Sequence, residues 1–424
     1  MKIYLGLGSN YGNRRENLSK GLQLLRAGGL VIEKVSPPFL NPPVLPEGCP
    51  EDWYRPFWNL ACVGTYGGDP LELLQLTQKV EQQVGRGPHL PNEPRTLDID
   101  ILFWGQRQVE LGHLRIPHPG ALSRSFTLAP LSLLDPSFVP PGQSLSLLEL
   151  NRAHSGSLKA IMGIFNLTPD SFSDGGAYRD QEKLRQELLR AIDSGVSVID
   201  LGGESTRPGA TPLTADQEWV RLEPALALLK EVCSGPTCRP WVSLDTRHPE
   251  TLRRAGEYIL DLANDVTGLS SRVYVEEIQR LGISAIAMHS LSVPADPKRH
   301  LPLSNPSWQQ ILLWTEEKIR TLEDWGLTKD RVFLDPGIGF GKTALQSLEL
   351  IRHLDSLEKF NMPLLLGHSR KSFLKLFTES PAAEREAETL GLSMAINGKP
   401  VEILRVHDYE SHLRAQLAYH AVNG

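Results

Sequence analysis

The segment TLDIDILFW (residues 96–104) carries two aspartates, Asp98 and Asp100, within an otherwise apolar, strand-like run. Side chains alternate faces along a strand, so both carboxylates are expected on one face. Two such carboxylates repel each other unless a positive charge lies between them, and Mg²⁺ prefers oxygen ligands of this kind. Arg95, three residues before Asp98, adds a group that pairs with phosphate oxygens. The pattern predicts a site for a nucleoside triphosphate with Mg²⁺. The alternative is a solvent-facing edge strand whose polar face is acidic.

A second group of chemically capable residues follows eight short apolar runs in the other half of the chain. The runs are AIMGIFN, SVIDLGGES, WVSLDT, YILDLAND, ISAIAMH, VFLDPG, PLLLGHS and EILRVHD. Polar residues stand at the C-terminal ends of these runs: Asn166, Glu204 to Arg207, Asp245, Asn264, His289, Asp335, Ser369 to Ser372, Arg405 and His407. Helix capping would explain a few of them, but not their presence at every end. In a barrel of parallel strands these ends meet at one mouth, so the pattern predicts a site there.

The elements that position these residues differ between the two halves. In the second half each apolar run is followed by a stretch long enough for a helix, and the runs are nearly all apolar, as buried parallel strands are. Eight such units between residues 160 and 424 predict a (β/α)₈ TIM barrel, which typically needs about 250 residues.

The first half predicts a smaller α/β or α+β unit. Three strands, IYLGLG, FWNLACVGTY and TLDIDILFW, alternate with the helices RRENLSKGLQLLRAG and DPLELLQLTQKVEQQVG. The second helix has Asp69 as its N-cap, Pro70 at its first position and Gly85 past its end. The polar segment NRAHSGS is typical of a linker. We therefore predict domains at residues 1–150 and 158–424, joined by a linker at 151–157.

The bulk composition narrows the class of protein. A chain of 424 residues predicts two or three domains, and a net charge of −6 disfavours a nucleic-acid partner. The four cysteines form no CxxC pair, which favours free thiols in a reducing compartment. No apolar run approaches the roughly 20 residues of a membrane span, and MKIYLGLGSN begins as a strand rather than a signal peptide. We expect a cytoplasmic protein without a membrane partner.

Motifs of the second half resemble dihydropteroate synthase. They are MGIFNLTPDSFSDGG, IDLGGESTRPGA, VSLDT, LDPGIGFGK, LLGHSRKS and LRVHD, in family order between residues 160 and 410. The resemblance implies loss of diphosphate from a pterin diphosphate, followed by attack of the p-aminobenzoate amine on the resulting pterin-methyl cation. The pterin-binding residues that it implies are Asp245, Asn264, Met288, Asp335, Phe340, Lys371 and Arg405. The implied p-aminobenzoate pocket is Phe172, Thr206, Arg207 and Ser372. Asn166, a Mg²⁺ ligand by the same resemblance, is expected to face the diphosphate with Arg405 and His407.

Motifs of the first half resemble 6-hydroxymethyl-7,8-dihydropterin pyrophosphokinase, which implies a ferredoxin-like α+β fold. They are LGLGSN, NPPVLP, FWNLA, GRGP, EPRTLDIDILFWG and IPHPGALSRSF. The resemblance implies that Asp98 and Asp100 hold Mg²⁺ and that a diphosphoryl group passes from ATP to the pterin, leaving AMP. Arg86 is implied as a further catalytic cation beside Arg95. The implied ATP-binding residues are Gln78, Glu81, Arg95, His118 and Arg124; a solvated helix face is the alternative for Gln78 and Glu81. The implied pterin-binding residues are Pro43, Val44, Phe57, Asn59 and Phe126.

Together the two resemblances imply a bifunctional transferase that performs two consecutive steps of folate biosynthesis. Its cofactor would be Mg²⁺, with ATP, hydroxymethyl-dihydropterin and p-aminobenzoate as substrates, and a second copy of the chain through the barrel as an optional partner. Three alternatives stay open. The N-terminal half could be an inactive structural partner. The barrel could be a pterin-binding barrel of the corrinoid methyltransferase kind, which Thr206-Arg207 and SRKS disfavour. The chain could also be a pterin-binding module that is not an enzyme.

Overall fold

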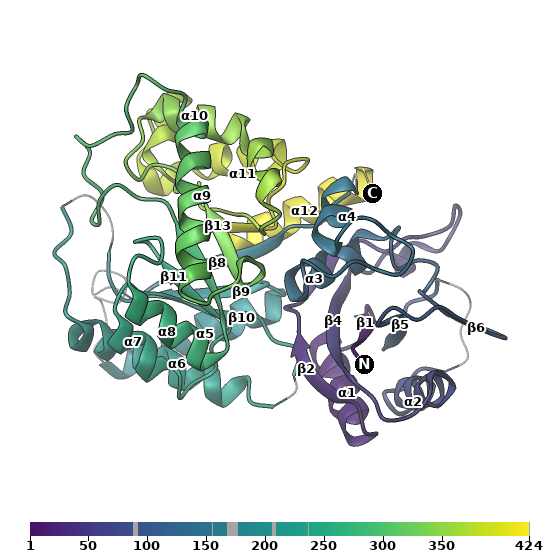
Figure 1. Cartoon of the computed structure of the whole chain (residues 1–424). Helices are drawn as coiled ribbons and strands as arrows, with labels where there is room; N and C mark the ends of the chain where they lie inside the picture. The colour runs from purple at the N-terminus through teal and green to yellow at the C-terminus, as the bar shows by residue number, and fades with distance from the viewer. Residues whose placement is uncertain (88–91, 155, 168–176, 206–208, 236, 424) are drawn as a thin grey trace. The chain divides into compact units, whose positions relative to one another are not determined.

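The computed structural model describes residues 1–87, 92–154, 156–167, 177–205, 209–235 and 237–423. The chain divides into two compact units (Figure 1). Unit 1 comprises Met1–Leu158, Ser234–Pro240 and Leu413–Gly424, and unit 2 comprises Lys159–Cys233 and Trp241–His412. The predicted domain bounds stay a prediction.

Unit 1 is built on an antiparallel sheet that runs in the order β2-β4-β1-β5, with β3 paired to β4. Its strands are β1 (Ile3–Ser9), β2 (Val31–Val35), β3 (Phe39–Asn41), β4 (Phe57–Thr65) and β5 (Asp98–Trp104). Helix α1 (Arg14–Ala27) follows β1, and helix α2 (Pro70–Gln83) precedes β5. This order of strands and helices confirms the expected ferredoxin-like α+β fold.

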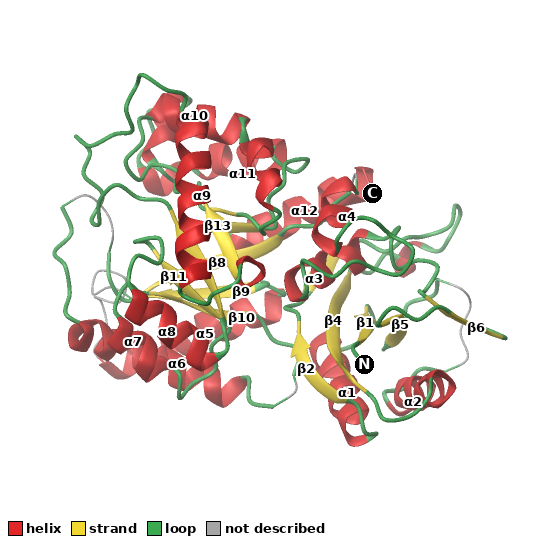
Figure 2. Cartoon of the chain, in the orientation of Figure 1, coloured by secondary structure: helices red, strands yellow, loops and turns green. Residues whose placement is uncertain are grey.

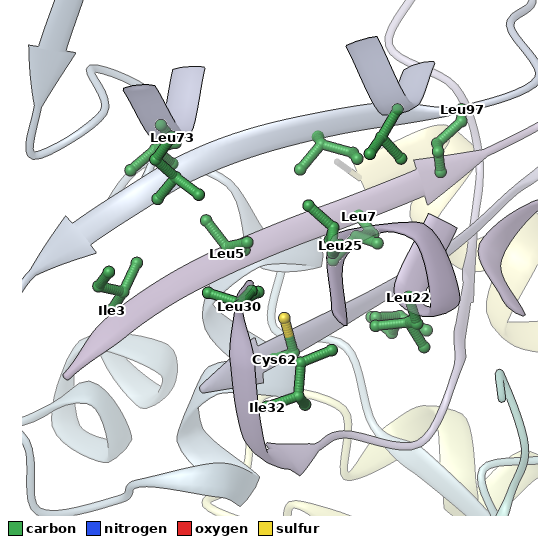
Figure 3. Close-up of a cluster of buried hydrophobic side chains, with 14 of the residues drawn as sticks. Ile3, Leu5, Leu7, Leu22, Leu25, Leu30, Ile32, Cys62, Leu73 and Leu97 are labelled. Atoms are coloured by element: carbon green, nitrogen blue, oxygen red, sulfur yellow. The ribbon is translucent and has the colours of Figure 1, made fainter. Parts of the chain in front are cut away.

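Both helices begin at the residues that the sequence indicates. The Asn13 side chain accepts a hydrogen bond from the N–H of Glu16 at the start of α1, and Asp69 forms a capping box with Glu72 at the start of α2. Each helix buries one apolar face against the sheet. Figure 3 shows Leu22 and Leu25 of α1, Leu73 of α2 and the apolar side chains of β1 in this cluster. This cluster therefore lies on one face of the sheet, while Tyr4 and Phe103 are buried on the other face, part of which is left for a site.

Unit 1 also contains elements that the sequence pattern did not predict. These are strands β2 and β3, the hairpin β6 (Val109–Leu111) and β7 (Leu114–Ile116), and helices α3 (Ser125–Leu134) and α4 (Leu147–Ala153). Helix α3 packs against β4. Helix α4 begins at a capping box formed by Ser146 and Glu149 and continues to Ala153, so the first residues of the expected linker are helical.

Unit 2 is a closed barrel of eight parallel strands, ringed by helices (Figure 2). The strands are β8 (Ala160–Asn166), β9 (Val198–Gly202), β10 (Trp241–Asp245), β11 (Leu262–Asp265), β12 (Ser284–Met288), β13 (Val332–Asp335), β14 (Leu365–Leu366) and β15 (Ile403–Val406). A parallel bridge between Leu334 and Leu364 joins the two end strands and closes the barrel. All eight predicted runs form strands, although several strands are shorter than the apolar run that contains them.

Helices follow the strands as the β-α alternation predicts. They are α5 (Ala177–Ser194), α6 (Ala215–Val232), α7 (Pro249–Ala255), α8 (Arg272–Leu281), α9 (Ser307–Asp324), α10 (Ala344–Arg352), α11 (Glu386–Ala395) and α12 (Tyr409–Asn423). Short 3₁₀ helices are η1 (Glu51–Trp53), η3 (Lys329–Arg331), η4 (Leu354–Phe360), η5 (Ser372–Leu376) and η6 (Ala382–Glu384). Within the described part of the chain, no helix combines the length and the apolar character needed to cross a membrane.

Because the eight strands of the barrel are parallel, their C-terminal ends, with their polar residues, meet at one mouth.

Candidate active sites

A cavity of about 370 Å³ lies beside strands β1, β4 and β5 of unit 1. Asp98 and Asp100 of β5 line it, and Gly8 and Gly6 stand opposite them in the register of β1. Because glycine carries no side chain, no side chain of β1 stands beside either carboxylate in the cavity. The strand β5 is an edge strand, as the alternative from the sequence required, but its acidic face lines a cavity.

Cations surround the two aspartates. Arg86 Nη1 lies 2.7 Å from Asp98 Oδ1, and Arg95 Nη1 lies 3.3 Å from Asp98 Oδ2. His118 Nε2 lies 3.6 Å from Asp100 Oδ1. Burial raises the pKa of Asp100, and the charge of Asp98 raises it further. The pair therefore has the charge and the oxygen donors to attract a hard cation. Among the described residues, no group of three or more His, Cys, Asp or Glu side chains is arranged so that it could hold a metal ion by itself.

Glu81 of α2 is buried, and its side chain points toward strand β5. Its carboxylate accepts hydrogen bonds from Arg86 and from the N–H of Ile99, the latter at 2.7 Å. Burial raises the pKa of Glu81 to about 7, and Arg86 opposes this rise. Gln78, one helical turn earlier, is exposed. The structure thus does not bring Gln78 and Glu81 together on one open surface, and it shows that Glu81 holds Arg86 beside Asp98.

The predicted pterin-binding residues of unit 1 all line the same cavity. They are Pro43, Val44, Phe57, Asn59 and Phe126. The guanidinium of Arg95 lies 5.7 Å from the ring centre of Phe57, and that of Arg124 lies 5.7 Å from the ring centre of Phe126. The Asn59 amide donates to the side chain of Asn41, a residue of the cavity wall that the sequence analysis did not identify.

At the mouth of the barrel, Arg405 of β15 is held between two carboxylates. Arg405 Nε lies 2.7 Å from Asp200 Oδ2, and Nη2 lies 2.6 Å from Asp200 Oδ2 and 2.7 Å from Asp245 Oδ2. The Asn264 amide lies 3.4 Å from both oxygens of Asp200. Burial raises the pKa of Asp245 to about 7; Asp200 adds to the rise and Arg405 opposes it. Asp245, Asn264 and Arg405, predicted from separate motifs, are therefore brought together.

Lys371 and Asp335 belong to the same site. A Cβ atom on Gly367 would lie 3.6 Å from Asp335 Oδ2, 3.8 Å from Lys371 Nζ and 3.9 Å from Arg405 Cδ, so these three side chains converge beside that glycine. Lys371 Nζ donates to the carbonyl oxygen of Ile338 at 2.6 Å and lies 4.6 Å from the ring centre of Phe340. Burial lowers the pKa of Lys371 to about 8 and raises that of Asp335. The mouth thus presents acids, bases and an aromatic face to one space.

The remaining predicted residues of the barrel lie around this group. His407 Nδ1 lies 3.0 Å from Ser369 Oγ, and Asn166 pairs in register with Gly202 at the ends of β8 and β9. Met288 is buried at the end of β12, and Ser372 is exposed at the start of η5. Phe172, Thr206 and Arg207 lie outside the described residues.

Asp200 is the residue of this site that the sequence analysis missed. It is a carboxylate in the middle of the apolar run SVIDLGGES, two residues before Gly202. Strand alternation places Asp200 and Gly202 on the same face of β9. A carboxylate on the interior face of a barrel strand needs a cationic partner. The presence of Asp200 in this apolar run could therefore have indicated that it belongs to the site.

Comparisons with known protein families match both halves. A family model described as 7,8-dihydro-6-hydroxymethylpterin-pyrophosphokinase matches residues 4–136, and one described as pterin binding enzyme matches residues 162–407. The "Folate synthesis bifunctional protein" of Chlamydia caviae is 35% identical over 97% of this chain and 96% of that relative. The protein of the same name from Chlamydia muridarum is 34% identical over 98% and 97%.

Solved structures match the barrel unit. A dihydropteroate synthase from Clostridium difficile, determined in the presence of pteroic acid, aligns with a TM-score of 0.55 and 30% identity over 63% of this chain and 98% of that chain. A dihydropteroate synthase from Xanthomonas albilineans with 4-aminobenzoic acid aligns with a TM-score of 0.56 and 30% identity, over 62% and 93% of the two chains. A third, from Anaplasma phagocytophilum with bound 6-hydroxymethylpterin-monophosphate, aligns with a TM-score of 0.55 and 28% identity, over 62% and 98%.

Proposed function

We propose roles for the residues of both sites on the premise that this chain belongs to the family of folate synthesis bifunctional proteins. The chain is a bifunctional transferase that performs two consecutive steps of folate biosynthesis. Unit 1 carries the pyrophosphokinase, which uses ATP, and the barrel carries the dihydropteroate synthase. An inactive, structural N-terminal half is not favoured, because the kinase family model matches residues 4–136.

In the kinase we assign Asp98 and Asp100 as the residues that would hold Mg²⁺. When bound, Mg²⁺ supplies positive charge that stabilises the phosphate oxygens of ATP. Arg86 and Arg95 already lie against Asp98, so their guanidinium groups are within reach of phosphate oxygens that approach this carboxylate. Gln78, His118 and Arg124 are our further candidates for contacts with the nucleotide. Glu81 would act through Arg86.

For the pterin of the kinase we assign the remaining walls of the same cavity. The rings of Phe57 and Phe126 would stack on the two faces of the flat pterin, and Asn59 would hydrogen-bond to its edge. Pro43 and Val44 would close the apolar side. Asp98 and Asp100 line the same cavity as these residues, which supports placing the pterin hydroxymethyl group beside the phosphates. Catalysis would then consist mainly of positioning and charge stabilisation.

In the synthase the convergence of Asp335, Lys371 and Arg405 beside Gly367 carries the assignment. Asp245, Asn264 and Asp335 would hydrogen-bond to the aminopyrimidinone edge of the pterin, and Lys371 to its other edge. Arg405 would stack on the ring face, with Met288 and Phe340 as apolar neighbours. Asn166, His407 and Arg405 would face the diphosphate, and Asn166 would be the ligand for a Mg²⁺ ion there.

The reaction at this site would proceed without a strong base. The carbon–oxygen bond to the diphosphate breaks, and the diphosphate leaves with the electron pair. The amine nitrogen of p-aminobenzoate then forms the new bond to the pterin methylene carbon and loses a proton to solvent. Phe172, Thr206, Arg207 and Ser372 are our candidates for the p-aminobenzoate pocket.

A coupled assay tests both activities on the intact chain. Hydroxymethyl-dihydropterin, ATP, Mg²⁺ and p-aminobenzoate should yield AMP, diphosphate and dihydropteroate. A parallel reaction supplies pterin diphosphate directly and omits ATP. Product in the second reaction but no AMP in the first would restore the structural-partner alternative, and product in neither would reject the function of both units. We further propose a homodimer through the barrel, which sedimentation velocity would test.

A further inference from the structure

The barrel contains a buried carboxylate whose role the reaction does not yet explain. Asp200 lies in the middle of β9, and its side chain is 0% exposed. It accepts a hydrogen bond from Arg405 Nε at 2.7 Å and forms an ion pair with Arg405 Nη2 at 2.6 Å. The Asn264 amide lies 3.4 Å from both of its oxygens. A carboxylate buried this deeply is costly unless it is paired and hydrogen-bonded, and these contacts meet that need.

The second carboxylate beside Arg405 is held differently. Asp245 receives one contact, from the same Nη2 atom at 2.7 Å, and its side chain is 21% exposed. Asp200 therefore contacts two nitrogen atoms of the guanidinium, Nε and Nη2, while Asp245 contacts Nη2 alone and is partly exposed. A ligand that reaches the mouth can take over the contact of Asp245 without freeing Arg405, because the hydrogen bond from Nε to Asp200 and the ion pair with Asp200 remain.

We propose that Asp200 is a positioning residue of the synthase, which fixes the Arg405 side chain and so leaves Asp245 available to the pterin edge. This inference rests on the proposed pterin-binding roles of Arg405 and Asp245. Asp200 itself does not touch the substrate. It acts through Arg405, which it holds in one orientation across the mouth, and through the Asn264 amide, which lies beside the same carboxylate.

The first test is Asp200→Asn in the full-length chain, with preformed pterin diphosphate and p-aminobenzoate as substrates. The amide keeps the shape of the side chain but loses the charge that holds Arg405. We expect kcat/KM for pterin diphosphate to fall about 10- to 100-fold, mostly through KM, while KM for p-aminobenzoate stays within about twofold.

Ser243→Ala is the matched control. Ser243 stands opposite Asp200 in the register of β10 and is buried, and its hydroxyl has no hydrogen-bond partner. The variant removes a buried polar group from the same layer of the barrel without touching Arg405. Its kinetics should match those of the wild type. A loss equal to that of Asp200→Asn would show that any disturbance of this layer is sufficient, and would overturn the inference.

The second test is a double-mutant cycle with Arg405→Met. If Asp200 acts through Arg405, adding Asp200→Asn to the Arg405→Met chain should change kcat/KM by less than about twofold. The double variant should also melt at a higher temperature than Arg405→Met, which leaves Asp200 charged and unpaired; this comparison still decides if Asp200→Asn alone folds poorly.

Two outcomes of the cycle would overturn the inference. One is the same fold-loss from Asp200→Asn in both backgrounds, and the other is an equal loss for both substrates. A wild-type chain that makes no dihydropteroate in the same assay would instead reject the proposed function.

Discussion

The two sites gather the same kinds of charge but hold them in different ways. In unit 1 the side chains of Asp98 and Asp100 are 27% and 33% exposed, and both line an open cavity. In the barrel Asp200 and Asp335 are buried, and Arg405 and Lys371 meet their partners inside the strand ends. The first arrangement lets substrates and ions replace the internal partners. In the second arrangement, the charged partners are buried parts of the folded barrel.

This difference predicts where a substitution will be felt. Removing one partner of an open ion pair returns the other to water, which costs little stability. Removing one partner of a buried pair leaves an uncompensated charge, which costs several kcal/mol. We therefore expect changes in the cavity of unit 1 to alter catalysis alone, and changes in the barrel to alter binding and stability together.

The largest effect is expected from Asp98→Ala. It removes a carboxylate that we assign to Mg²⁺, so AMP formation should fall by about a thousandfold or more. The same chain should convert supplied pterin diphosphate to dihydropteroate at the wild-type rate, and its melting temperature should change little. Asp52→Ala, at an exposed acidic residue of η1, is the control for loss of a negative charge. Loss of both activities in a folded variant would contradict independent sites.

A smaller loss is expected from Lys371→Met in the barrel. The variant keeps the length of the side chain but removes the ammonium that lies beside Asp335. Use of pterin diphosphate should fall about 10- to 100-fold in kcat/KM, the scale of a lost charged hydrogen bond in a buried site. The melting temperature should also fall, because Asp335 loses a cation. Lys375→Met, at an exposed lysine of the same loop, should change neither quantity. Unchanged kinetics in Lys371→Met would refute the assignment.

The pH dependence of the synthase should reveal the buried character of its carboxylates. The pKa of Asp245 is raised to about 7, so this group is protonated below neutral pH in the free enzyme. The neutral form no longer accepts hydrogen bonds as an ion, and it no longer pairs with Arg405. We expect kcat/KM for pterin diphosphate to fall about tenfold per pH unit below the pKa of Asp245, and to fall again above about pH 8, where Lys371 loses the proton of its ammonium group. A profile that stays flat down to pH 5.5 would contradict this expectation.

The sequence predicted those parts of the fold and of the sites that depend on one continuous segment. The eight strands with polar ends and the pair Asp98 and Asp100 follow from local periodicity. Asp200 did not, because its cation Arg405 lies 205 residues later in the chain. A solvated helix face was the alternative for Gln78 and Glu81, but Glu81 is buried and its carboxylate accepts a hydrogen bond from Arg86. Features that depend on a partner in another element were hidden in the sequence.

The register between neighbouring strands also depends on a partner element and so could not be predicted from the sequence. Substitutions that test it have the smallest expected effect on kinetics. Gly6 and Gly8 of β1 stand opposite Asp100 and Asp98, yet a methyl group would meet different neighbours at the two positions. At Gly8 the new Cβ would lie 2.5 Å from Asn59 Oδ1, so the amide must move. At Gly6 it would lie 3.2 Å from Leu102 Cδ1, an apolar side chain that can shift by a few tenths of an ångström.

Gly8→Ala should therefore raise KM for hydroxymethyl-dihydropterin about fivefold, the scale of one neutral hydrogen bond, whereas Gly6→Ala should change it by less than twofold. Both variants should keep the wild-type KM for ATP and the wild-type synthase activity, because the atoms nearest to each added methyl group belong to uncharged side chains. Steady-state kinetics of AMP formation on the two chains would decide the matter. Equal effects at both positions would mean that the added volume in the cavity weakens pterin binding. In that case Asn59 does not hydrogen-bond to the edge of the pterin.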